Sequence, residues 1–258
     1  MNPILFRVFA YLKFLLRSGN AHGLHSPFVY SLYAKGLKNK ISRSQFDAIE
    51  ALREDFLNDS TEIEIKDFGA GSQTMKSGKR KIKSIAKNSV SGKRKCEILF
   101  RLVNYLEAKR ILELGSSLGI STAYLKLGNP KSEIISVEAD ENLVTIASRH
   151  LKNGVILLNE KFDNALNSEP IKSFNPDLVF IDGDHRGASL LNYVDILKKN
   201  TEKDCCIVID DIYWSEDMNK AWLQLKEDQR FGISIDLFHV GMLFTHEKLV
   251  KQHFDLRF

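Results

Sequence analysis

Cysteine is scarce in this 258-residue sequence, and the few cysteines form no recognisable pattern. Cys96, Cys205 and Cys206 make an odd number, and no Cys/His spacing typical of a zinc site is present. Two of them lie in an apolar run, so we expect buried thiols in a reducing compartment rather than a disulfide framework. The sequence therefore predicts a cytoplasmic protein.

A membrane-spanning run is also lacking. Residues 4–16 are apolar, but Arg7 and Lys13 interrupt them, and the run is too short to cross a bilayer. It has neither the basic start nor the small-residue cleavage site of a signal peptide. We expect a helix that packs on the main domain or on a second subunit, which would make the protein a homodimer. A peripheral membrane contact through this helix is the alternative.

Acidic residues are missing from one stretch of the chain. Nine lysines and arginines lie between Lys76 and Lys95 without an aspartate or glutamate, although the net charge of the whole chain is only +4. The basic character is therefore local, and the remainder of the chain is net acidic. This basic segment is interpreted as a solvated lid helix, or as a surface that binds the phosphates of a nucleic acid.

The chain changes character near residue 96. Before it come the apolar helix, a helical region near 45–57 and the basic segment. After it, strand and helix patterns alternate, which is typical of a parallel α/β sheet. We therefore divide the chain into an N-terminal helical and lid extension, 1–95, and an α/β domain, 96–258.

Short apolar runs predict five parallel strands that are covered by helices on both faces. Two further runs, 233–238 and 241–246, lie so close together that they predict an antiparallel hairpin. The expected sheet is Rossmann-like, mostly parallel and seven-stranded. The parallel strands are expected at 110–114, 133–138, 155–158, 177–182 and 205–210.

A glycine turn follows the first of these strands, with the sequence E-L-G-S-S-L-G-I-S-T at 113–122. Glycines are needed where the backbone turns sharply or where a ligand touches the main chain. Ser121 then opens a helix whose N-terminal amides attract an anion, either a pyrophosphate or the carboxylate of a methionine moiety. The dinucleotide pattern G-x-G-x-x-G fails here, because Ser117 and Ile120 stand where it needs glycine.

The pattern E-x-G-x-x-x-G-x-S resembles motif I of the class I S-adenosylmethionine-dependent methyltransferases. Within that class it is most similar to the small-molecule O-methyltransferases of the catechol and caffeoyl-CoA type. Glu138 ends the second strand, where an acid can accept hydrogen bonds from both ribose hydroxyls. The resemblance implies S-adenosyl-L-methionine as cofactor. It assigns the cofactor site to Glu113, Gly115, Ser116, Ser117, Gly119, Ser121, Glu138, Ala139, Phe162 and Asp182.

Acids also end the fourth and fifth parallel strands. Because the carboxyl ends of parallel strands line the ligand crevice, we expect Asp182, Asp210 and Asp211 to converge. Carboxylates brought together repel one another unless a cation or protons intervene, and Mg²⁺ or another divalent cation would relieve that repulsion. The resemblance implies such a metal, held by an Asp and an Asp-Asn pair at these places. In this sequence Asp211 stands where the pattern has Asn.

The same resemblance makes His185, three residues after Asp182, the general base. A histidine that titrates near neutrality is suited to taking the proton from a nucleophile. The sequence thus predicts an enzyme that methylates a hydroxyl of a small molecule, with Asp182 and His185 as catalytic residues. The alternatives are an RNA methyltransferase that uses the basic segment, and a cofactor-binding module without catalysis. An Asn/Asp-Pro-Pro-Tyr/Phe motif, expected for methylation of a nucleic-acid amine, is lacking after the fourth strand.

A second strand-and-glycine pattern, I-K-D-F-G-A-G-S, occurs at 65–72. If it were the cofactor turn, a strand that ends in an acid should lie near position 90, where the chain reads S-V-S-G-K. We interpret this pattern as a turn in a lid over the active site, or as a merely structural turn.

Overall fold

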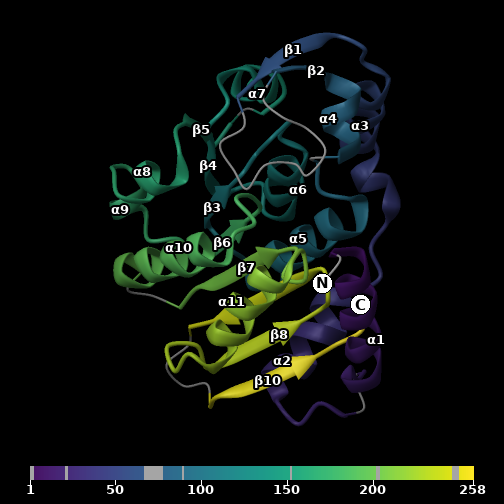
Figure 1. Cartoon of the computed structure of the whole chain (residues 1–258), viewed down its shortest axis with the longest axis vertical. Coiled ribbons are helices and arrows are strands. Elements are labelled where there is room, and N and C mark those ends of the chain that lie inside the picture. The colour runs from purple at the N-terminus through teal and green to yellow at the C-terminus, as the bar shows by residue number, and fades with distance from the viewer. Residues whose placement is uncertain are drawn as a thin grey trace.

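Within the residues that the structure describes, an eight-stranded sheet forms the centre of the molecule (Figure 1). Its strand order is β10-β8-β9-β7-β6-β3-β4-β5. The strands are β3 (Arg110–Leu114), β4 (Glu133–Glu138), β5 (Val155–Asn159), β6 (Leu178–Ile181), β7 (Cys206–Asp210), β8 (Ile233–Asp236), β9 (Val240–Phe244) and β10 (Gln252–Asp255). The structure is a computed structural model that describes residues 3–20, 23–66, 78–88, 90–151, 153–201, 204–245 and 250–258.

Strand direction follows the expected scheme. The strands β3 to β7 pair in parallel, and β9 is antiparallel to both β7 and β8. The Rossmann-like, mostly parallel sheet with an antiparallel hairpin is therefore confirmed. The strand β10, parallel to β8, is an eighth strand that the sequence analysis did not foresee. Its sequence, Q-H-F-D, is too polar to give the apolar signal of a buried strand.

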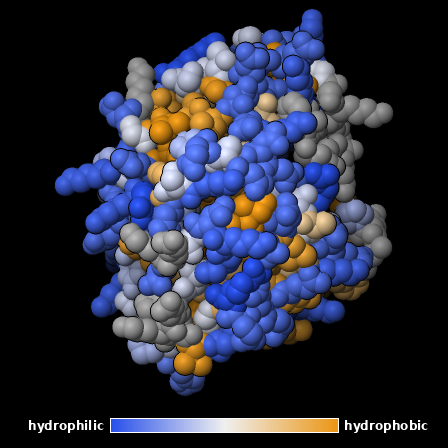
Figure 2. Space-filling model, turned by 90° about the vertical axis from the view of Figure 1, so that its left-hand side faces the viewer, coloured by the Kyte–Doolittle hydropathy of each residue, from blue (hydrophilic) through white to orange (hydrophobic). Residues whose placement is uncertain are grey.

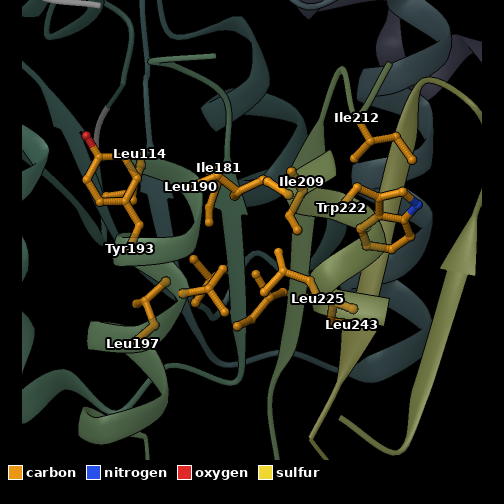
Figure 3. Close-up of a cluster of buried hydrophobic side chains, with 14 of the residues drawn as sticks. Leu114, Ile181, Leu190, Tyr193, Leu197, Ile209, Ile212, Trp222, Leu225 and Leu243 are labelled. Atoms are coloured by element: carbon orange, nitrogen blue, oxygen red, sulfur yellow. The ribbon is translucent and has the colours of Figure 1, made fainter. Parts of the chain in front are cut away.

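Both faces of the sheet are apolar. Successive residues of a strand point to opposite sides of the sheet, and here successive residues are apolar, so apolar side chains cover both faces. On one face, Leu112 and Leu114 pack with residues of α10 (Gly187–Asn200) and α11 (Glu216–Glu227). Figure 3 shows this layer, in which Leu190 and Tyr193 of α10 lie over the strands. On the opposite face, Ile111 packs with α5 (Lys93–Leu106) and α6 (Ile120–Gly128). Three further helices, α7 (Glu141–Ala147), α8 (Phe162–Leu166) and α9 (Ile171–Phe174), lie toward the β5 edge.

The N-terminal third contains the expected helices near 4–16 and 45–57, as α1 and α3. It also contains an antiparallel pair of strands that the sequence did not predict. The helix α5 crosses position 96, so the expected boundary falls inside a helix, and the division of the chain stays a prediction. The glycine pattern at 67–72 lies outside the described residues. The N-terminal elements are α1 (Pro3–Arg17), α2 (Pro27–Ser31), the helical turns Leu32–Leu37 and Arg43–Phe46, α3 (Asp47–Asn58), β1 (Glu62–Ile65), β2 (Gly78–Lys81) and α4 (Ile82–Asn88).

The helix α1 lies against the C-terminal part of the sheet. The Arg17 guanidinium anchors it there, 3.1 Å from an Asp236 oxygen and 2.9 Å from an Asp255 oxygen. The outer side of α1 is apolar, and Leu16 is 89% exposed. The face of the molecule on the side of α8 and α9 is different, since it is mostly hydrophilic with separate apolar areas (Figure 2). None of the helices in the described part of the chain is long and apolar enough to cross a membrane.

Trp222 is the largest fully buried side chain in the described core, and it supports the hairpin. Its ring packs directly on Gly241, and its indole N–H donates to Asp236 at 3.3 Å. We expect Trp222→Ala to lower the free energy of unfolding by about 3–5 kcal/mol, because it leaves a large cavity. The control is Leu223→Ala on the exposed side of the same helix, for which we expect a change below about 0.5 kcal/mol. Urea unfolding followed by circular dichroism measures both, and equal losses would contradict this account of the core.

Candidate active site

The turn after β3 depends on a close approach of two backbones. Gly115 has a φ of +106°, a conformation that strains any residue with a side chain. A Cβ at this position would lie 1.9 Å from the backbone oxygen of Asp182, so no other residue fits. The Asp182 amide donates to the Leu114 carbonyl at 2.8 Å. The glycine turn and the acid that follows β6 are therefore held side by side.

Two serines occupy the middle of this turn. The hydroxyl oxygens of Ser116 and Ser117 are buried and have no hydrogen-bond partner among the described residues. Buried polar groups normally have partners, so these oxygens indicate a polar group that the described residues do not supply. Gly119, with a φ of +81°, then leads into α6, whose first turn contains Ser121.

Glu138 faces the turn from the end of β4. Its two carboxylate oxygens accept the backbone amides of Ser117 and Asp140, each at 3.0 Å. Burial raises the pKa of this carboxyl group. Each oxygen keeps further acceptor capacity, so Glu138 can still receive the hydroxyls of a ribose. The free serine hydroxyls and this acid fit the cofactor that the sequence pattern implies.

A cavity of about 370 Å³ connects the turn with the acids at the strand ends. The predicted site residues that line it are Gly115, Ser117, Glu138, Ala139, Phe162, Asp182, His185, Asp210 and Asp211. The predicted cofactor residues that the lining does not include are Glu113, Ser116, Gly119 and Ser121. Glu113 is fully buried beneath the turn, where it accepts hydrogen bonds from the hydroxyls of Thr122 and Ser136. Glu113 therefore stabilises the turn from inside the protein and does not face the cavity.

The strand-end acids converge as predicted, and a lysine lies among them. The Lys95 ammonium is 2.6 Å from Asp210 Oδ2 and 3.6 Å from Asp211 Oδ1. Burial opposes the charge on Lys95, but the attraction of Asp210, Asp182 and Asp211 outweighs it and raises the pKa of the lysine. Burial and the repulsion from the two neighbouring carboxylates raise the pKa of Asp210. The second oxygen of Asp210, Oδ1, is buried without a partner among the described residues.

The divalent cation expected from the sequence does not fit this arrangement. An ammonium group already lies between the carboxylates that would hold the metal. Asp182 is also engaged, since its Oδ2 accepts a hydrogen bond from the Ser91 hydroxyl at 2.6 Å. Among the residues that the structure describes, no three acids, histidines or cysteines are arranged to hold a metal ion.

His185 lies at the rim of the same cavity, beneath an aromatic and cationic stack. Its ring is 5.5 Å from the ring of Trp214, and the guanidinium of Arg7 lies 4.2 Å from the centre of the Trp214 ring. Because Arg7 belongs to α1, the N-terminal helix reaches the wall of the site. Two other aromatic residues that follow β7 have structural roles, since Tyr213 donates to Asp236 at 2.6 Å and Trp222 is in the core.

Residues 112–212 match the protein family described as a methyltransferase domain. The match begins within β3 and ends just after β7, so it contains all the strand-end acids of the site. The expectation of a class I methyltransferase, the class that uses S-adenosylmethionine, is confirmed. A comparison with curated proteins gives no match.

Solved structures of methyltransferases have a similar fold. An SAH-bound methyltransferase from Podospora anserina has a TM-score of 0.56 and 16% identity, over 85% of this chain and 96% of that one. An O-methyltransferase from Bacillus cereus in complex with SAH has a TM-score of 0.54 and 15% identity, over 80% and 92%. The SAM-bound O-methyltransferase TomG from Streptomyces achromogenes has a TM-score of 0.53 and 15% identity, over 86% and 96%. At these identities the likeness shows the fold alone.

Lys95 and Ser91 are the site residues that the sequence analysis missed. Both come from the N-terminal side of the methyltransferase domain match, in or next to the basic segment. Lys95 was counted among nine basic residues, and a run of like charges normally indicates a solvated surface. The signal that could have found it was the expectation of converging acids, because a basic side chain of the same chain is one source of the cation that relieves their repulsion.

The buried Glu113 makes the stability of the methyltransferase depend on pH. Burial raises the pKa of Glu113 to about 7, so its contribution is present below the pKa of the unfolded chain and is lost as the pH rises through 7. Glu113→Gln cannot ionise. We therefore expect its free energy of unfolding, relative to the natural protein, to rise by about 3 kcal/mol between pH 5 and pH 8.

Urea unfolding at intervals across this pH range measures the difference. Glu133→Gln at the exposed start of β4 is the matched control and should show no such trend. Parallel curves for the natural protein and Glu113→Gln would contradict the assignment.

Proposed function

We propose that the protein is an S-adenosylmethionine-dependent O-methyltransferase that methylates a hydroxyl of a small molecule. The observation that carries the proposal is the shared cavity, which brings the glycine turn and Glu138 together with the strand-end acids and His185. A cavity of about 370 Å³ is of the size of small-molecule sites. Two proteins of similar fold, from Bacillus cereus and Streptomyces achromogenes, are O-methyltransferases, which supports oxygen as the methyl acceptor.

In this proposal the glycine turn and its serine hydroxyls hold the cofactor, and Glu138 receives its ribose hydroxyls. S-adenosylmethionine, when bound, supplies an electrophilic methyl group on a sulfonium. The chain then has to place the acceptor oxygen in line with that methyl group and to remove the proton of the hydroxyl. His185 lines the cavity and is assigned the role of proton acceptor.

The basic segment gives little support to the alternative of an RNA methyltransferase, because its side chains serve different surroundings. Lys95 enters the cavity, whereas Lys93 lies 3.4 Å from Glu50. Lys93 and Arg94 both line a separate hollow beside α5. A nucleic-acid surface would need these charges on one continuous face. The homodimer, the peripheral membrane contact through α1 and the cytoplasmic location stay predictions from the sequence.

Cofactor binding tests the first part of the proposal. We expect S-adenosylhomocysteine to bind the natural protein in isothermal titration calorimetry. Glu138→Ala should weaken binding about 10- to 100-fold, because it removes hydrogen bonds to a carboxylate. Glu141→Ala, at an exposed position just beyond the site, is the control and should bind as the natural protein does. No heat of binding with the natural protein would contradict the proposed cofactor.

A labelling assay tests the acceptor. S-adenosylmethionine with a labelled methyl group is incubated with the protein and catechol, caffeate or a transfer RNA mixture as acceptor probes. We expect label in a phenolic probe and none in RNA. Label in RNA would favour the nucleic-acid alternative. Cofactor binding without transfer to any probe would favour a binding module.

A further inference from the structure

The ammonium of Lys95 lies among the carboxylates where the sequence analysis expected a divalent metal ion. It lies among carboxylates that follow two adjacent parallel strands, at 2.6 Å from the nearest carboxylate oxygen of Asp210. Asp210 has only 2% of its side chain exposed, so its charge is removed from water and needs a partner inside the protein. Lys95 supplies that partner from α5, a helix that begins outside the matched methyltransferase domain.

The lysine also has donors left for a ligand. An ammonium group carries three N–H donors, and Asp210 receives one of them at hydrogen-bond distance. The Lys95 side chain keeps 21% of its surface exposed and lines the cavity. It can therefore donate to an oxygen bound there. A salt bridge that only tied α5 to β7 would not need to be open to the cavity.

We propose that Lys95 is the resident cation of this active site and replaces the divalent metal in holding the acceptor oxygen of the substrate. The inference rests on the proposed function, since it concerns the same reaction. The substrate hydroxyl loses its proton to the base. Its oxygen then forms a bond to the methyl carbon while the carbon–sulfur bond breaks and sulfur keeps the electron pair. The ammonium stabilises the negative charge that develops on the oxygen before the new bond is complete.

We expect a substrate of this site to offer a single hydroxyl oxygen to the Lys95 ammonium, rather than a pair of oxygens that would chelate a metal ion. A metal ion accepts two oxygens from a substrate such as a catechol, whereas the ammonium binds each oxygen by a separate, weaker hydrogen bond. We therefore expect phenols or alcohols with a single hydroxyl to be accepted alongside catechols.

Direct metal binding tests the proposal without an assay of activity. Mn²⁺ is titrated into the natural protein, Lys95→Met and Lys95→Ala, and the free ion is counted by its electron paramagnetic resonance signal. We expect no stoichiometric site in the natural protein. We expect Mn²⁺ binding at least tenfold tighter in the variants, because both oxygens of Asp210 are then free beside Asp211 and Asp182. Lys93→Ala, which removes an exposed cation two residues earlier on the same helix, is the control and should stay like the natural protein.

A stoichiometric Mn²⁺ site in the natural protein, as tight as in Lys95→Met, would overturn the proposal. This measurement is decisive even if Lys95→Ala fails to fold, and Lys95→Met keeps the length and apolar packing of the side chain. S-adenosylhomocysteine binding in the same samples reports on the proposed function separately, and we expect it to be retained in all of them. With any acceptor that the labelling assay identifies, turnover should withstand excess EDTA and fall about 100-fold or more in Lys95→Met. Loss of turnover on adding EDTA would also overturn the proposal.

Discussion

The active site depends on how charge is balanced at the ends of β6 and β7. Asp182, Asp210 and Asp211 follow these neighbouring strands, and parallel pairing forces them together whatever else the chain does. Their mutual repulsion would destabilise the fold unless a positive charge were supplied. The Lys95 ammonium supplies this charge at 2.6 Å from Asp210. Lys95 belongs to α5, which packs on the face of the sheet opposite α10 and α11. The charge balance thus joins the N-terminal third to the methyltransferase domain.

The second constraint is steric, and it explains why the cofactor turn and the acids share a cavity. Gly115 passes so close to the backbone of Asp182 that a single methyl group would not fit between them. The same contact places the glycine turn, where we propose that the cofactor binds, beside the carboxylates. A methyl transferase needs this proximity, because donor and acceptor must lie in line over a short distance. The contact between the two backbones therefore fixes the positions of the glycine turn and the acids relative to each other before any ligand binds.

The parts of the fold that repeat a simple pattern could be predicted from the sequence. The strands β3 to β7 are buried on both faces, so their apolar runs predicted each strand end to within one residue. The strands β1, β2 and β10 are short and polar, and only their pairing partners make them strands. Glu138 and the strand-end acids followed from the same logic. Lys95 did not, because its role comes from a contact 115 residues away in the chain.

The matched segment and the N-terminal third contribute different residues to the site, and this difference bears on which substrate the site accepts. The matched segment contains the glycine turn, Glu138 and the strand-end acids. The N-terminal third supplies Lys95 and Ser91 against the acids, and Arg7 over the ring of Trp214. Ser91 and Lys95 line the cavity on what we propose to be its acceptor side, and Arg7 lies over Trp214, which also lines it. A change in the N-terminal elements can therefore alter the acceptor, or exchange a metal for an ammonium, while the sheet and its cofactor turn remain the same.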